Sequence, residues 1–179
     1  MRVVAGELRG RRLASPGRRA DVRPTADRVR EALFAILGDV DGARVLDLFC
    51  GTGALAIEAI SRGAAHATLV DSRPQLARRN VADLGLDERA EVVRADALRF
   101  LAGGRERFDM IFCDPPYRLA DRFEGPLQRL VPARLAPGGK LIVESSARRP
   151  LRLDLPLVTE RRYGETVVLI HELPGGDGG

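Results

Sequence analysis

The chain has 179 residues, 45% of them hydrophobic and 30% charged, which is ordinary for a globular protein and fits one domain. No apolar run is long enough for a membrane span and no signal-peptide pattern opens the chain, so we expect a cytoplasmic protein without membrane contact. The formal net charge is +4. Residues 1–30 contain nine arginines but only three acidic residues. Such a basic segment on a nearly neutral remainder favours a polyanionic partner.

The N-terminal part, residues 1–42, is predicted to carry this basic character on two elements. Two short strand-like pieces within residues 3–16 flank a glycine-containing turn, which predicts a β-hairpin. Residues 23–37 follow as an amphipathic helix that Gly38 ends. Its expected apolar stripe consists of Val29, Leu33, Ile36 and Leu37.

The core, residues 43–173, alternates between strand-like and helix-like segments. Strands are predicted at 44–49, 67–71, 90–96, 107–113, 138–145, 157–163 and 166–173. Helices are predicted at 54–63, 74–85, from 97 through 101, and at about 124–135. This alternation is typical of an α/β fold with a doubly wound, mostly parallel sheet. The glycine-rich end, residues 174–179, is expected to be a flexible tail.

A metal site and a disulfide are not expected. Cys50 and Cys113 each end an apolar run, so we interpret them as buried free thiols. His66 and His171 are isolated, and no cluster has the spacing of zinc ligands.

Open parallel sheets bind ligands beyond the carboxyl ends of their strands, and the first strand ends in a suitable motif, Asp47 through Gly53. Gly51 and Gly53 allow a tight turn and close approach of a ligand, while the following helix offers free N–H groups to a carboxylate or a phosphate. Asp47 can accept from an ammonium group. This pattern suits the methionine part of S-adenosylmethionine, but it also fits a dinucleotide fingerprint, which leaves NAD as an alternative.

The second and third strands each end in an acidic residue. Asp71 lies about 20 residues beyond the glycines, where a carboxylate can bind ribose hydroxyls of either cofactor. Asp96 with Ala97 can contact an adenine ring, although Asp96 is equally suited to cap the next helix.

The fourth strand ends in Asp114-Pro115-Pro116-Tyr117, the most discriminating motif in the chain. The prolines fix the backbone and leave carbonyl acceptors exposed. Asp114 and the Pro115 carbonyl can accept the two hydrogens of an aromatic amine, and Tyr117 can stack on its ring. The motif therefore indicates a site that orients a base amine.

These motifs, in this order and spacing, resemble class I S-adenosylmethionine-dependent methyltransferases that act on amines. Residues 3–13, 23–34 and 161–170 extend the resemblance to the bacterial 16S rRNA (guanine(966)-N(2))-methyltransferase family over nearly the whole chain. The resemblance implies a Rossmann-like seven-stranded sheet whose last strand is antiparallel. It also implies transfer of a methyl group, without metal, to a guanine N2 of 16S rRNA or the small ribosomal subunit.

The resemblance implies site residues as well. We assign Asp114, Pro115, Pro116 and Tyr117 to catalysis. The residues assigned to S-adenosylmethionine are Asp47, Phe49, Gly51, Thr52, Gly53, Asp71, Ser72, Asp96 and Ala97. Those assigned to RNA are Arg9, Arg11, Arg12, Arg23 and Arg28. No coiled-coil pattern is present, so we expect a monomer.

Three other functions remain to be weighed against this one. A dehydrogenase would use the same glycine loop, but it would leave the motif at Asp114 without a purpose. A noncatalytic RNA-binding assembly factor would not need that motif intact. A DNA adenine-N6 methyltransferase shares the motif, but this small chain carries no added domain for reading duplex sequence.

Overall fold

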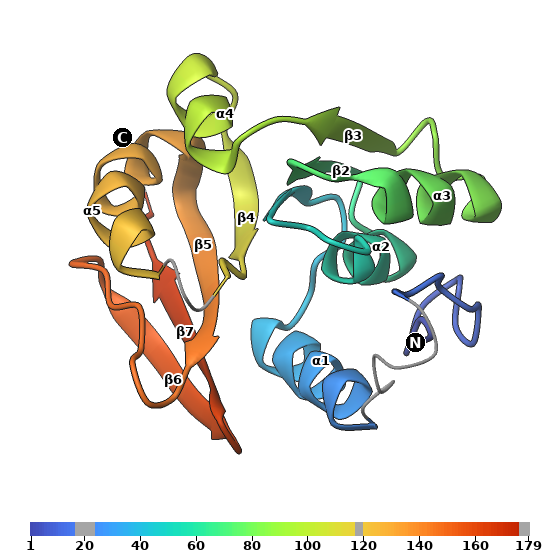
Figure 1. The fold of residues 1–179 in the computed structure, drawn as a ribbon, viewed down its shortest axis with the longest axis horizontal. Coiled ribbons are helices and arrows are strands. Elements are labelled where there is room, and N and C mark those ends of the chain that lie inside the picture. Colours follow the sequence, from blue (N-terminus) through green and yellow to red (C-terminus); the bar gives the residue numbers. More distant parts are fainter. Residues whose placement is uncertain (17–23, 117–119, 176–179) are drawn as a thin grey trace.

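The computed structural model describes residues 1–16, 24–116 and 120–175, and in this part of the chain seven strands form one sheet (Figure 1). Their order across the sheet is β3-β2-β1-β4-β5-β7-β6. The strands are β1 (Arg44–Leu48), β2 (His66–Asp71), β3 (Ala90–Arg94), β4 (Phe108–Cys113), β5 (Leu135–Ser146), β6 (Leu157–Tyr163) and β7 (Thr166–Glu172). The first five run parallel, whereas β7 is antiparallel to both β5 and β6. The doubly wound, mostly parallel sheet and its antiparallel last strand are thus confirmed.

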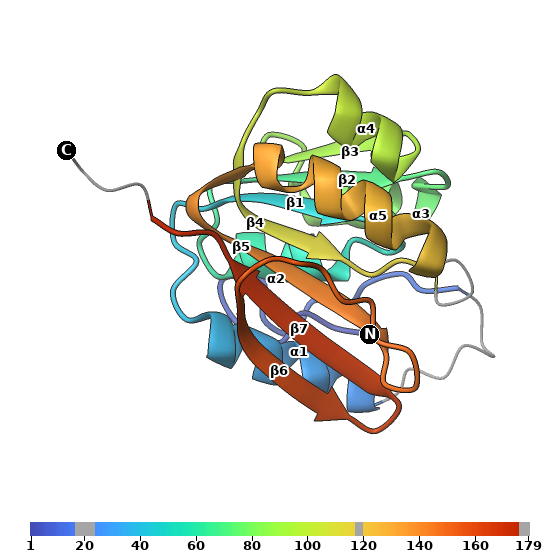
Figure 2. The same ribbon diagram turned by 90° about the vertical axis from the view of Figure 1, so that its left-hand side faces the viewer.

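Helices cover both faces of this sheet (Figure 2). One face packs on α1 (Pro24–Leu37), α2 (Ala54–Ser61) and α3 (Gln75–Leu84). The other packs on α4 (Ala97–Gly103) and α5 (Ala120–Leu130), which a short 3₁₀ turn, Pro132–Arg134, links to β5. Two apolar clusters, one on each face, form the core, and this layering leaves the carboxyl ends of β1 to β4 at a common edge.

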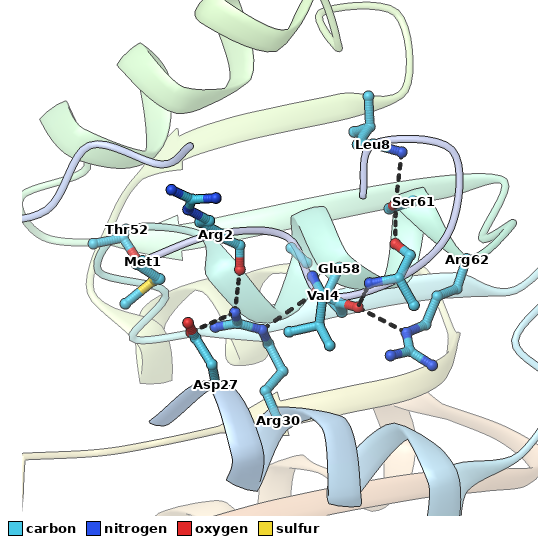
Figure 3. Close-up of polar contacts among 12 residues, drawn as sticks. Met1, Arg2, Val4, Leu8, Asp27, Arg30, Thr52, Glu58, Ser61 and Arg62 are labelled. Atoms are coloured by element: carbon cyan, nitrogen blue, oxygen red, sulfur yellow. Dashed lines mark hydrogen bonds and ion pairs between the residues drawn. The ribbon is translucent and has the colours of Figure 1, made fainter. Parts of the chain in front are cut away.

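The predicted N-terminal β-hairpin is wrong. Residues 1–16 contain one isolated antiparallel bridge, between Arg2 and Arg12, and no regular strands. Side chains of α2 take the backbone donors that a partner strand would have used: Val4 and Ala5 donate to the Glu58 carboxylate at 2.8 and 2.9 Å. The segment is therefore held by hydrogen bonds to α2, several of them to side chains of that helix, in place of a regular strand ladder (Figure 3).

Two helices differ in detail from the expectation. In α1, Phe34 is buried, while Ile36 of the predicted stripe is 37% exposed. The helix predicted near 124–135 begins at Ala120, contains Pro126, and ends at Leu130 because Pro132 follows. The tail predicted to be flexible extends from the described residues 174 and 175 into 176–179, which lie outside them. None of the described helices combines the length and apolar character that a bilayer crossing requires.

Candidate functional site

Two adjoining cavities lie at the carboxyl edge of the sheet. The β2–β3 cavity, about 550 Å³, is bounded by Val70, Asp71, Ser72, Ala95, Asp96, Ala97, Pro115, Pro116 and Phe123. The α1 cavity, about 320 Å³, is bounded by Met1, Val29, Arg30, Leu33, Asp47, Cys50, Thr52, Ala54, Leu55, Glu144, Tyr163 and Thr166. Phe49 and Asp114 line both cavities. Residues predicted from four separate motifs therefore meet around one continuous site.

The loop after β1 forms the floor between the cavities. Phe49 has a φ of +60° and packs edge-on against Phe123 of α5, with ring centroids 4.9 Å apart. Gly53 has a φ of +76°, and a Cβ added there would lie 2.5 Å from Cδ2 of Leu69. The positive φ favours glycine, because the loop has to turn tightly into α2, and a larger residue would also have to displace the end of the Leu69 side chain.

Asp47 is almost completely buried at the end of β1. Its Oδ2 accepts from the backbone N–H of Ala56 at 3.3 Å. Loss of hydration raises the pKa of this carboxyl to about 7, and the negative charge of Asp71 adds to the shift. A cation placed in the α1 cavity would reverse this effect, so Asp47 suits the ammonium group for which it was predicted.

The acidic residues after β2 and β3 border the β2–β3 cavity. Asp71 accepts from the backbone N–H groups of Gly51 at 2.9 Å and Arg73 at 2.7 Å, one on each oxygen. Each oxygen keeps a second lone pair with which it can accept from a ligand. Asp96 caps α4 by accepting from the N–H of Arg99 at 3.0 Å, as its alternative reading predicted, and its other oxygen has no such bond among the described residues.

Asp114 follows β4 at the junction of the cavities. Although solvent reaches this residue, the surrounding protein raises the pKa of its carboxyl to about 8, first by desolvation and then through the charges of Glu144 and Asp47. Burial likewise raises the pKa of Glu144 on β5. Tyr117 lies outside the described residues, so its predicted role has no structural counterpart here.

The N-terminal segment forms a wall of the α1 cavity. Met1 lines the cavity and accepts a hydrogen bond from Thr52 Oγ1 at 3.7 Å (Figure 3). Arg30 also lines it and binds the buried carboxylate of Glu58, with 3.3 Å between Nε and Oε2. Asn80 of α3 donates to the carbonyl of Thr52 at 2.9 Å and accepts from the N–H of Ala14 at 2.6 Å. The side chain of Asn80 thus binds both the N-terminal segment, at Ala14, and the glycine loop, at Thr52.

Of the arginines predicted to bind RNA, Arg9, Arg12 and Arg28 are exposed, and Arg23 lies outside the described residues. Arg11 is also exposed and donates to the carbonyl of Asp83 at 3.3 Å. Glu58, Asn80 and Glu144 were not predicted as functional. Each lies within a helix or a strand, where a single polar residue gives no signal until the topology shows what it faces.

Comparison with known proteins identifies the family. A family model described as "Conserved hypothetical protein 95" matches residues 1–172. The chain belongs to this family. A Bacillus subtilis relative, "Putative rRNA methyltransferase YlbH", is 36% identical over 190 residues, covering 98% of this chain and 100% of that protein. "Ribosomal RNA small subunit methyltransferase D" of Escherichia coli strain K12 is 41% identical over 124 residues, covering 66% of this chain and 61% of that protein.

The comparison with solved structures supports the same family assignment. "Putative methyltransferase yhhF from Escherichia coli" is 34% identical, with a TM-score of 0.81 over 98% of each chain. The Thermus thermophilus "16S rRNA N2 G1207 methyltransferase (RsmC) in complex with AdoMet and Guanosine" is 25% identical, with a TM-score of 0.70 over 87% of this chain and 44% of that one. The fold is that of class I methyltransferases, and the resemblance to the guanine(966)-N(2) family is confirmed.

Proposed function

We propose that this protein transfers a methyl group from S-adenosylmethionine to the exocyclic N2 amine of one guanine in 16S rRNA. The observation that carries the proposal is the position of Asp114 where the two cavities meet, with Pro115 next to it in the lining of the β2–β3 cavity. A methyl donor that extends from the β2–β3 cavity along the loop after β1, and a base that enters the α1 cavity, would present their reacting atoms to each other at that junction. The relatives named as ribosomal RNA methyltransferases supply the substrate class.

The residues around both cavities fit S-adenosylmethionine. We assign its adenosine to the β2–β3 cavity, where Asp71 and Ser72 would bind ribose and Asp96 with Ala97 would contact adenine. We assign its methionine part to the loop after β1. Asp47 would bind the ammonium group there, and the first turn of α2, including Ala54 and Leu55, would face the carboxylate.

The chemistry asked of the protein is mainly positioning. The sulfonium of S-adenosylmethionine supplies an activated methyl group, so the chain has to hold a weak nucleophile in line with it. Asp114 and the Pro115 carbonyl would accept the two amine hydrogens and fix the plane of the amine. Alignment of this kind lowers a barrier by up to about 7–11 kcal/mol. The carboxylate of Asp114 is also placed to take up the proton that the amine releases.

The RNA must bring its base out of the helical stack to reach this junction. We assign Arg9, Arg11, Arg12 and Arg28, together with Arg23, to the phosphates around the base. Arg9, Arg11 and Arg12 belong to the N-terminal segment, and Met1 of the same segment lines the α1 cavity. Phosphate binding by this segment would therefore bring the RNA to the entrance of the site.

The proposal is tested by nucleoside mass spectrometry after incubation with S-adenosylmethionine and unmodified small-subunit rRNA, free and assembled into particles. The expected product is N2-methylguanosine at one position, and the preferred substrate form shows whether ribosomal proteins help to present the base. Asp114→Ala serves as the inactive control. Methylation of an adenine, or of no RNA despite binding of the methyl donor, would contradict the assignment.

A further inference from the structure

Glu144 lies beside Asp114 on the wall of the α1 cavity. In the register of the parallel strands, Cys113 of β4 pairs with Val143 of β5, so that Asp114 and Glu144 are the residues that follow this pair. The preceding Phe112 and Ile142 pack into the apolar cluster on the α1 face of the sheet. Alternation along each strand thus directs both carboxylates to the same face, where both line the α1 cavity.

This pair of carboxylates lacks donors within the described part of the chain. Arg30, the arginine of the cavity wall, is engaged by Glu58, Asp27 and the carbonyl of Arg2. Desolvation by the surrounding protein raises the pKa of both groups, and for Asp114 the charge of Glu144 adds to the shift. A ligand with several N–H donors along one edge would supply what the pair lacks.

Guanine has such an edge. Its N1–H and the two hydrogens of its N2 amine are donors in a row, whereas adenine places the bare acceptor N1 beside its amine. With the amine bound by Asp114 and the Pro115 carbonyl, the next group along the guanine edge is N1–H, and the next acceptor along the sheet is Glu144.

We propose that Glu144 is the residue that selects guanine, by accepting a hydrogen bond from N1–H of the base whose amine is held by Asp114. This inference rests on the proposed transfer to a guanine amine. An adenine in the same position would direct the N1 lone pair at the Glu144 carboxylate, and the site would reject it. A site built to bind a particular N–H discriminates strongly against an analogue without it, because its own acceptor is left unpaired.

The test compares guanine with 2-aminopurine, which keeps the 2-amine but has no N1–H. Short RNAs of the target sequence carry one or the other base, and kcat/KM for methyl transfer is measured with wild-type protein and with Glu144→Gln. The matched control is Glu91→Gln. Glu91 is an exposed glutamate on β3, an edge strand that three strands separate from β5. A comparison of ratios cancels the different intrinsic reactivities of the two amines.

We expect wild-type protein and Glu91→Gln to prefer guanine, and Glu144→Gln to lower this preference by about 10- to 100-fold. The glutamine oxygen is an uncharged and weaker acceptor for N1–H of guanine, and its NH₂ group can donate to the bare N1 of 2-aminopurine. Thermal unfolding and S-adenosylmethionine binding verify that Glu144→Gln is folded. If it is not, the wild-type protein still decides through binding, which does not depend on the reactivity of the amines: equal affinities for the two RNAs would overturn the role of N1–H. An unchanged preference in folded Glu144→Gln would overturn this inference alone, whereas no transfer to either RNA by wild-type protein would overturn the proposed function with it.

Discussion

The backbone of Gly6 lies directly against the carbonyl of Ser61, the last residue of α2. A Cβ added to Gly6 would be 1.7 Å from that oxygen, and Gly6 has a φ of +80°. The neighbouring Glu7 donates its N–H to the same oxygen at 2.8 Å, and Leu8 donates to Ser61 Oγ at 2.9 Å. This contact fixes the N-terminal segment on the core.

We therefore expect Gly6→Ala to release the segment and to lower the free energy of unfolding by about 2 kcal/mol or more, because backbone, and not a flexible side chain, blocks the added methyl. Gly10→Ala is the matched control: its φ is +82°, but the added Cβ meets nothing within 4 Å. It should cost only the conformational strain of about 1 kcal/mol. Denaturant unfolding measures both, and trypsin should cleave after Arg9 or Arg11 faster in Gly6→Ala alone. Equal behaviour of the two variants would show that the contact with Ser61 is unimportant.

Asp114→Ala should lower kcat by at least about 100-fold while leaving the affinity for S-adenosylmethionine within about threefold. The removed acceptor is one that orients the amine in the transition state, and losses of this size are usual for such groups. Asp114→Asn keeps an acceptor oxygen and should retain more activity than the alanine variant. Single-turnover kinetics and equilibrium binding separate the two effects. Near-normal turnover in Asp114→Ala would remove this residue from the mechanism.

Asp47→Asn should stabilise the unliganded protein at pH 8 and not at pH 4. The pKa of Asp47 is raised to about 7 in the folded protein, against an ordinary value of 3.8 for an aspartate in water. The folded state therefore binds the proton more tightly, and the stability that this provides is present below about pH 4 and is lost as the pH rises to 7. Asparagine has no charge to bury, so at pH 8 it should gain up to about 4 kcal/mol. The exposed Asp87 offers the control Asp87→Asn.

The measurement is the Tm of each Asp47 and Asp87 variant across this pH range, without S-adenosylmethionine. A Tm difference between Asp47→Asn and wild type that is the same at pH 4 and pH 8 would contradict the raised pKa. The same variant should bind S-adenosylmethionine more weakly, because the ammonium group loses its counter-charge. Stability and ligand binding thus change in opposite directions at this position.

Replacement of Arg9, Arg11 and Arg12 by Gln should weaken RNA binding and reduce its salt dependence. Each lost phosphate contact lowers the slope of log K against log salt by about 0.7–0.9, so three contacts predict a change of about 2–3. A triple replacement of Arg105, Arg107 and Arg129, exposed residues far from the N-terminal segment in sequence, serves as the charge-matched control. Equal slopes for the two triple variants would give the N-terminal arginines a purely structural role.

The sequence predicted the positions of the site motifs because short-range patterns determine them. The strand-length apolar segments end close to Asp47, Asp71 and Asp114, and in a parallel sheet such ends share one edge. In the structure these strands are buried along almost their whole length, as expected for parallel strands covered by helices on both faces. Continuous apolar runs therefore placed the central strands to within one to three residues.

Long-range contacts are what the sequence could not provide. The pattern of residues 3–16 is that of a hairpin, yet its donors bind Glu58 and Ser61, more than fifty residues away. Glu144 has the local surroundings of any strand glutamate. Only the crossover that places β5 next to β4 brings it beside Asp114.

The attachment of the N-terminal segment also sets an order of events during synthesis. Its partners on the core include Glu58, Ser61 and Asn80, so this set of contacts is complete only when the chain has grown into α3. At about 5–20 residues per second, Ala14 waits roughly 3–13 s for Asn80, 66 positions later. The arginine-rich residues 1–16 are thus synthesised before their partners in α2 and α3, and they lack these contacts while the chain emerges beside ribosomal RNA.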